Sequence, residues 1–146
     1  MNILDYFDHP QKKQNIEYFV HLVRVAMADG VITDTEIQLL NNIGHKLGFT
    51  DPEIAALIEV ASKSDYIPPI QLSERFEQVY NIIKMTLADG VIDNNEMRLA
   101  SSFAAKSGFN ENEIPKLLVL LIRGIKEGKD EEDLFETYKK ERKSYS

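Results

Sequence analysis

Apolar residues recur at intervals of three and four along most of this chain, the spacing of helices that bury one face. In residues 14–27 these positions are Ile16, Phe19, Val20, Val23 and Met27. The same spacing returns in residues 37–47 and again after Pro52. Strict alternation of apolar and polar residues, which would indicate a half-buried strand, is absent. The pattern therefore predicts an all-α protein.

The pattern is repeated within the chain. Residues 28–36 (Ala-Asp-Gly-Val-Ile-Thr-Asp-Thr-Glu) return sixty positions later as residues 88–96 (Ala-Asp-Gly-Val-Ile-Asp-Asn-Asn-Glu). The match continues without a gap as far as Leu57 and its counterpart Leu117. Such self-similarity indicates a duplicated structural unit. We therefore expect one domain, residues 1–146, made of two pseudosymmetric helical units at about residues 14–64 and 74–127.

Start and stop signals divide the first unit into three helices. Gly30 is expected to end the first helix, because glycine readily takes the left-handed conformation found at helix C-termini. Thr33 and Glu36 have the spacing of a capping box, in which each side chain accepts a hydrogen bond from the other residue's backbone N–H. Gly48 is expected to end the second helix. Residues 50–53 (Thr-Asp-Pro-Glu) then open a third, with proline in its first turn.

The second unit repeats these signals after a break. Consecutive prolines within residues 65–69 favour an extended path there. Residues 93–96 repeat the capping box, and residues 110–113 repeat the third cap. A further helix, residues 130–143, has no counterpart in the repeat and is expected to pack as a terminal cap through Leu134, Phe135 and Tyr138. These signals predict about seven to eight helices.

The composition narrows the classes of partner. A formal charge of −7, from 17 Lys and Arg against 24 Asp and Glu, would repel a nucleic-acid backbone. The chain has no cysteine, which excludes disulfides, thiolate metal sites and cysteine nucleophiles. No apolar run is long enough to span a membrane, and the N-terminal residues do not have the pattern of a signal peptide. We expect a cytoplasmic protein with a protein partner, without nucleic acid and without an integral membrane segment.

Motifs of known catalytic sites do not occur in the sequence. His9, His21 and His45 are scattered, and neither His-Glu-x-x-His nor Glu-x-x-His is present. The serines lack a Gly-x-Ser-x-Gly turn, and no glycine-rich phosphate loop precedes a helix. Hydrolysis by paired carboxylates would need two of them to converge, which the spacing neither supplies nor excludes. We therefore expect no enzymatic activity.

The acidic turn of each repeat is the main candidate for a binding site. Asp29 and Glu36, and likewise Asp89 and Glu96, match the later positions of a calcium-binding EF-hand loop. The earlier ligand positions fall on apolar residues, so neither turn is an EF-hand. Asp29 and Asp89 also place negative charge at the C-terminal end of a helix, where the helix dipole disfavours it. Such departures from a local rule are expected at functional sites.

Two interpretations of these turns remain open. In the first, the acidic cluster of each turn weakly binds a hydrated divalent cation (Ca, Mg or Mn) or attracts a basic partner; the clusters are Asp29, Asp34 and Glu36, and Asp89, Asp93 and Glu96. In the second, the same residues serve only as turn and capping residues. The chain is then an adaptor that holds a partner helix or an acyl-like ligand in a groove between its halves, with no metal site.

The doubled motif Ala-Asp-Gly-x-Ile-x-x-x-Glu, each copy followed by an amphipathic helix that ends in Gly-Phe, resembles the TerB family of tellurite-resistance proteins. The resemblance covers about residues 16–123 and extends to the domain that precedes the J-domain in DjlA-type co-chaperones. It implies an all-helical, non-enzymatic module with a role in tellurite or chemical stress. By position, it also implies a divalent metal ion at Asp29, Glu36, Asp89 and Glu96. The sequence contains no J-domain, so the resemblance implies no activity toward DnaK.

Overall fold

The computed structural model describes residues 10–28, 32–87 and 90–143. Seven α-helices and no strand lie within these residues, which confirms the prediction of an all-α protein. None of these helices is both long and apolar enough to cross a membrane. The chain divides into two compact units, residues 1–66 and 67–146.

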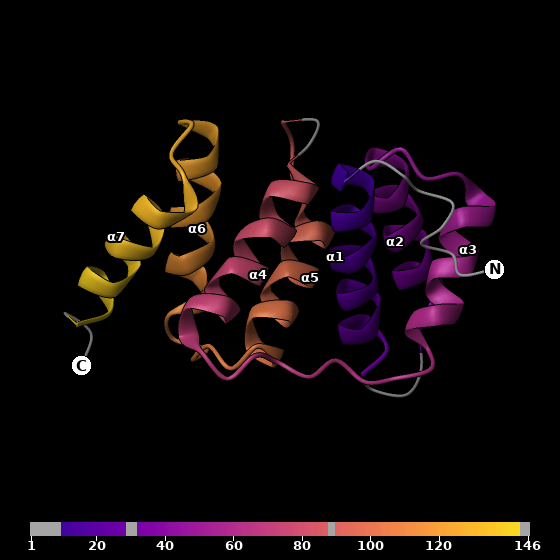
Figure 1. Cartoon of the computed structure of the whole chain (residues 1–146), viewed down its shortest axis with the longest axis horizontal. Coiled ribbons are helices and arrows are strands. Elements are labelled where there is room, and N and C mark those ends of the chain that lie inside the picture. Colours follow the sequence, from indigo (N-terminus) through magenta and orange to yellow (C-terminus); the bar gives the residue numbers. More distant parts are fainter. Residues whose placement is uncertain (1–9, 29–31, 88–89, 144–146) are drawn as a thin grey trace. The chain divides into compact units, whose positions relative to one another are not determined.

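The first unit contains the helices α1 (Pro10–Ala26), α2 (Asp34–Lys46) and α3 (Asp51–Ala61) (Figure 1). Each of the three packs against the other two. Phe19 on α1 is fully buried, and its ring meets the edge of the Phe49 ring at a centroid distance of 5.8 Å. A Cβ atom added at Gly44 on α2 would lie 2.6 Å from the Ile54 side chain. Glycine therefore allows α2 and α3 to approach closely.

The predicted starts of α2 and α3 are confirmed. Thr33 Oγ1 accepts a hydrogen bond from the Glu36 N–H at 3.2 Å, and Glu36 Oε1 accepts one from the Thr33 N–H at 3.3 Å. Thr50 and Glu53 form the same capping box at the start of α3. Gly48, just beyond α2, has a φ of +86°, the left-handed conformation that the sequence predicts at this helix end.

The second unit contains the helices α4 (Leu72–Thr86), α5 (Asn94–Lys106), α6 (Ile114–Lys126) and α7 (Glu131–Lys143) (Figure 1). The helices α4, α5 and α6 pack against one another, and α7 packs against α4 and α6. The core of the second unit includes fully buried side chains from α4, α5 and α6: Phe76, Val79, Ile82, Ile83, Phe103 and Leu121. A capping box of Asp93 and Glu96 opens α5, as predicted.

The prediction that residues 110–113 repeat the third cap is wrong in part. The Asn110 N–H donates to Glu113 Oε1 at 3.0 Å, which is one half of a capping box. However, residues 111–113 form a separate turn, and α6 begins only at Ile114. The reason is Pro115. A helix starting at residue 111 would place this proline at its fifth position, where a backbone N–H is needed, whereas the observed start keeps it in the first turn.

The terminal helix α7 packs as the sequence predicts. Leu134 and Tyr138 are buried, and Phe135 is partly buried. Asp130 Oδ1 accepts a hydrogen bond from the Asp133 N–H at 2.9 Å and so caps the start of the helix. Leu134 lies directly over Gly124 of α6, so close that an added Cβ atom there would overlap its side chain. This small residue therefore sets the distance between α6 and α7.

Candidate functional site

The structure describes only half of the predicted cation site. Asp29 and Asp89 lie outside the described residues, so their position beside the glutamates stays a prediction. Glu36 and Glu96 are described, and each belongs to a capping box at the start of its helix. Within residues 10–28, 32–87 and 90–143, no three His, Cys, Asp or Glu side chains are grouped so that they could hold a metal ion.

Glu36 and Glu96 have different surroundings, although they occupy matching positions in the repeat. Glu36 is half-buried, whereas Glu96 is only 1% exposed. At the second turn Asp93 takes the place of Thr33, and its Oδ1 accepts a hydrogen bond from the Glu96 N–H at 2.8 Å. Asn94 in turn replaces Asp34, so the two turns have the same number of carboxylates, but the glutamate of the second turn is less accessible to solvent.

A buried polar cluster that the sequence analysis missed lies around Glu113. Its Oε2 accepts a hydrogen bond from the Tyr138 hydroxyl at 3.1 Å and lies 3.6 Å from Arg142 Nε. These two α7 side chains compensate the charge of a buried carboxylate, which would otherwise be costly. In the described part of the chain, Glu53, at the matching position of the first unit, bonds only to Thr50. No short sequence motif predicts the cluster, because Glu113 and Tyr138 are 25 residues apart in the chain.

The cluster predicts a pH dependence of stability at alkaline pH. Burial raises the pKa of Tyr138 to about 12, and the neighbouring Glu113 carboxylate adds to the rise. Tyrosines of an unfolded chain titrate near 10, so the folded protein holds this proton more tightly than the unfolded chain does. The resulting stabilisation is complete below pH 10 and is lost as the pH rises from about 10 to 12. We expect Tyr138→Phe to remove this part of the decline.

The measurement is urea unfolding of both proteins between about pH 9 and 12, followed by circular dichroism. Tyr80 serves as the reference group, because burial also raises its pKa and it remains in both proteins. The wild-type protein should therefore lose more free energy of unfolding than the variant over this range. Equal losses in the two proteins would show that Tyr138 does not contribute.

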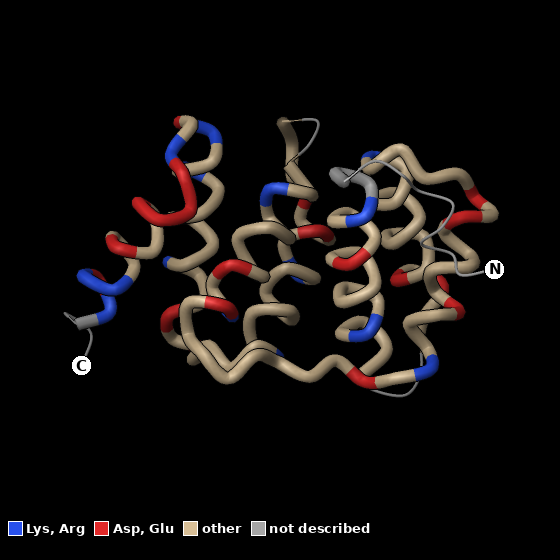
Figure 2. Tube along the Cα trace, viewed as in Figure 1, with Lys and Arg blue, Asp and Glu red and all other residues tan. Residues whose placement is uncertain are grey.

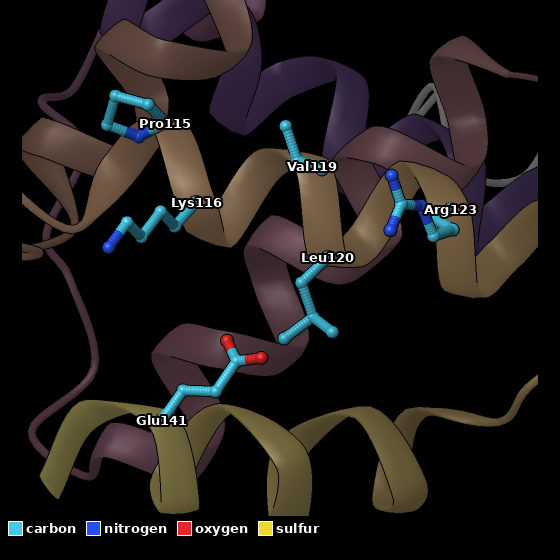
Figure 3. A pocket seen from close by; sticks show the side chains of 6 residues that line it. All are labelled: Pro115, Lys116, Val119, Leu120, Arg123 and Glu141. Atoms are coloured by element: carbon cyan, nitrogen blue, oxygen red, sulfur yellow. The ribbon is translucent and has the colours of Figure 1, made fainter. Parts of the chain in front are cut away.

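The surface of the second unit is hollowed along the outer side of α6. One groove, of about 370 Å³, is lined by Pro115, Lys116, Val119, Leu120, Arg123 and Glu141. Figure 3 shows Leu120 pointing from α6 toward α7, and Glu141 pointing back from α7. An adjoining hollow of about 390 Å³ shares two of these residues and is lined by Val119, Ile122, Arg123, Lys126 and Glu127. Together they form a continuous strip, residues 116–127 of α6 and its C-terminal end, which we call the α6 surface.

A sequence signal for the α6 surface does exist. Residues 117–122 are six consecutive apolar residues, so the helix is apolar on every side at this level. A helix of that kind is normally buried all round. Here Leu117, Leu118 and Leu121 are buried, while Val119 is 50% exposed. The apolar run therefore exceeds what the core of this unit covers.

Comparison of the chain with known protein families, with characterised proteins and with solved structures finds no match. The resemblance to the TerB family rests on the doubled motif and stays a prediction. The function of the chain is therefore inferred from the geometry of the described residues.

Proposed function

We propose that this chain is a non-enzymatic helical module that binds another protein through the α6 surface. The observation that carries the proposal is the apolar strip of Val119, Leu120 and Ile122, which lies in adjoining hollows rimmed by charged side chains. Apolar surface gathered in a hollow with a polar rim is typical of sites that bind proteins or ligands. Single exposed apolar residues are common on protein surfaces and do not by themselves indicate a binding site. In this strip, by contrast, three apolar residues are grouped.

The structural roles of four glutamates support a non-enzymatic function. Glu36, Glu53 and Glu96 accept hydrogen bonds within capping boxes at the starts of α2, α3 and α5. Glu113 is bonded to Tyr138 and faces Arg142, and so holds α7. Each of these carboxylates thus has a role in building the fold. The resemblance to TerB proteins suggests that the module acts as a scaffold in a tellurite or chemical-stress response.

The proposal is tested by photo-crosslinking in the native cell. A photoreactive amino acid is placed at Val119, and the matched control carries it at Val60, an exposed valine of α3 that is 37% accessible. We expect discrete adducts with the Val119 variant that the Val60 variant does not form, because only the first position lies on the proposed binding surface. The same pattern of adducts at both positions, or no adduct at Val119, would contradict the proposal.

A second candidate function, the binding of a divalent cation at the acidic turns, is favoured by Asp93. This residue brings a carboxylate to the second turn, as Asp34 does to the first, and Ca, Mg and Mn take oxygen ligands of this kind. In this proposal Asp29 and Glu36 form one weak, hydrated site, and Asp89 and Glu96 form the other. The capping role of the glutamates is compatible with it, because a carboxylate has two oxygens and several lone pairs.

The cation proposal is tested by an NMR titration of chelator-treated protein with calcium, magnesium and manganese. We expect saturable shifts or broadening of the amide signals of both Gly30 and Gly90, because each of them directly follows an aspartate of its turn. The control is the double variant Asp29→Asn and Asp89→Asn, in which the response should be lost. Unchanged signals up to millimolar metal would contradict the cation proposal and leave the acidic residues with turn and capping roles alone.

A further inference from the structure

We infer that the α6 surface binds an acidic amphipathic helix of a partner protein. This inference rests on the proposed interaction function and specifies the chemistry of the partner. Three features of the surface lead to it: its length, the arrangement of its apolar side chains and the position of its basic side chains.

The length and the apolar side chains of the surface suit a helix. Lys116 and Lys126 are ten residues apart on α6, which corresponds to about 15 Å along the helix axis. A docked helix uses apolar side chains at positions i, i+4 and i+7, which span about 10 Å. Leu120 lines the first hollow, Ile122 lines the second, and Val119 lines both. The two adjoining hollows therefore offer successive places for the side chains of one partner helix.

The basic side chains of the surface favour acidic residues on that helix. Lys116, Arg123 and Lys126 all line the hollows, at both ends and in the middle of the strip. In the described part of the chain, no ion pair engages Arg123 or Lys126. Two acidic residues also line the hollows. The carboxylate of Glu127 is paired with Lys129 at 3.3 Å, and Glu141 lies in the first hollow, which does not include Lys126. A partner with Asp or Glu beside its apolar anchors would complement Arg123 and Lys126.

The acidity of the rest of the chain favours a short partner over an extended polyanion. The whole chain has a formal charge of −7, and the first turn of α7 carries three acidic residues, Glu131, Glu132 and Asp133 (Figure 2). An anionic membrane or a nucleic acid would extend beyond the α6 surface to such regions and be repelled there. A helix that covers only the strip meets mainly its local basic charge, because screening limits the reach of other charges to about 8–10 Å.

The inference is tested with the full chain and a phage-displayed library of helix-forming peptides of about 16 residues, long enough to cover the strip. Selected peptides are measured against the wild-type protein and against Val119→Asp and Lys126→Glu. The control variant is Val60→Asp, which places the same charge at an exposed valine of the first unit. Circular dichroism confirms that each variant is folded. Vesicles containing phosphatidylserine are tested in parallel as the membrane alternative.

We expect the selected peptides to carry apolar residues at helical spacing flanked by Asp or Glu. Val119→Asp should weaken their binding by at least about tenfold, because it places a charge among the apolar contacts. Lys126→Glu should also weaken it, and peptides with Lys in place of Glu should recover part of the loss. Val60→Asp should leave the affinity unchanged.

Other results would overturn the inference. Selected peptides that are neutral or basic, but are still sensitive to Val119→Asp, would refute the acidic partner and leave the proposed interaction function standing. Peptides insensitive to Val119→Asp would place binding elsewhere. Vesicle binding lost in Val119→Asp, without any selected peptide, would assign the surface to a membrane. If neither peptides nor vesicles bind, the inference is wrong, and the crosslinking at Val119 decides separately on the proposed function.

Discussion

Replacing Phe76 with alanine is expected to lower the free energy of unfolding of the second unit by about 3–5 kcal/mol. Phe76 is fully buried on α4, and its ring contacts two aromatic rings of α7. The centroid distances are 4.9 Å to Phe135 and 5.5 Å to Tyr138. Removing the ring would leave a cavity under α7 and abolish these aromatic contacts. The measurement is urea unfolding followed by circular dichroism, with hydrogen exchange to locate the loss.

The control for this prediction is which helices lose amide protection against hydrogen exchange. Amide protection should fall in α4 and α7, while protection in α1, α2 and α3 should stay at its wild-type level. Ile16→Ala, at the matching position of the first unit, should show the opposite distribution, since Ile16 is buried in that unit. A loss below about 1 kcal/mol for Phe76→Ala, or an even loss over both units, would contradict the packing of α7 on α4.

The second large effect is expected for Gly124→Ala on α6. Alanine in a helix interior normally stabilises relative to glycine by about 1 kcal/mol. At this position the added Cβ atom would come within 3.0 Å of Leu134 Cγ and overlap the ends of the same side chain. Because Leu134 is 1% exposed, it has little room to move away. We expect a net loss of about 1–3 kcal/mol in the free energy of unfolding, with α7 losing protection first.

A double-mutant cycle separates this overlap from other effects of the substitution. Leu134→Ala alone should cost about 2–5 kcal/mol through lost burial. On that background Gly124→Ala should cost nothing further and should show the stabilising effect of helix propensity, since the overlapping atoms are gone. The prediction fails if Gly124→Ala is equally destabilising with and without the Leu134 side chain.

Local chemistry explains why the starts of α2, α3 and α5 are predictable from the sequence. Thr33 with Glu36, Thr50 with Glu53 and Asp93 with Glu96 form boxes whose members are three residues apart. Such contacts depend on neighbouring residues alone, so they can be inferred without knowledge of the tertiary structure. The start of α6 departs from the repeat because Pro115 has no counterpart in the first unit.

The candidate surfaces are less predictable because they depend on long-range packing. The bond between Glu113 and Tyr138 joins residues that become neighbours only when α7 docks. For α6, the apolar run at residues 117–122 is visible in the sequence, but which of its sides stays uncovered depends on where α4, α5 and α7 lie. The predicted cation site also remains incomplete, since Asp29 and Asp89 lie outside the described residues.

Glu53 and Glu113 occupy matching positions in the repeated sequence, yet they are not exchangeable. Glu53 closes a local turn, whereas Glu113 also anchors α7, a helix without a counterpart among the described residues of the first unit. A tolerance map obtained by mutating one repeat therefore cannot be transferred position by position to the other. Glu53→Gln would test only a helix cap. The same change at the matching position, Glu113→Gln, would test the attachment of the whole C-terminal helix α7.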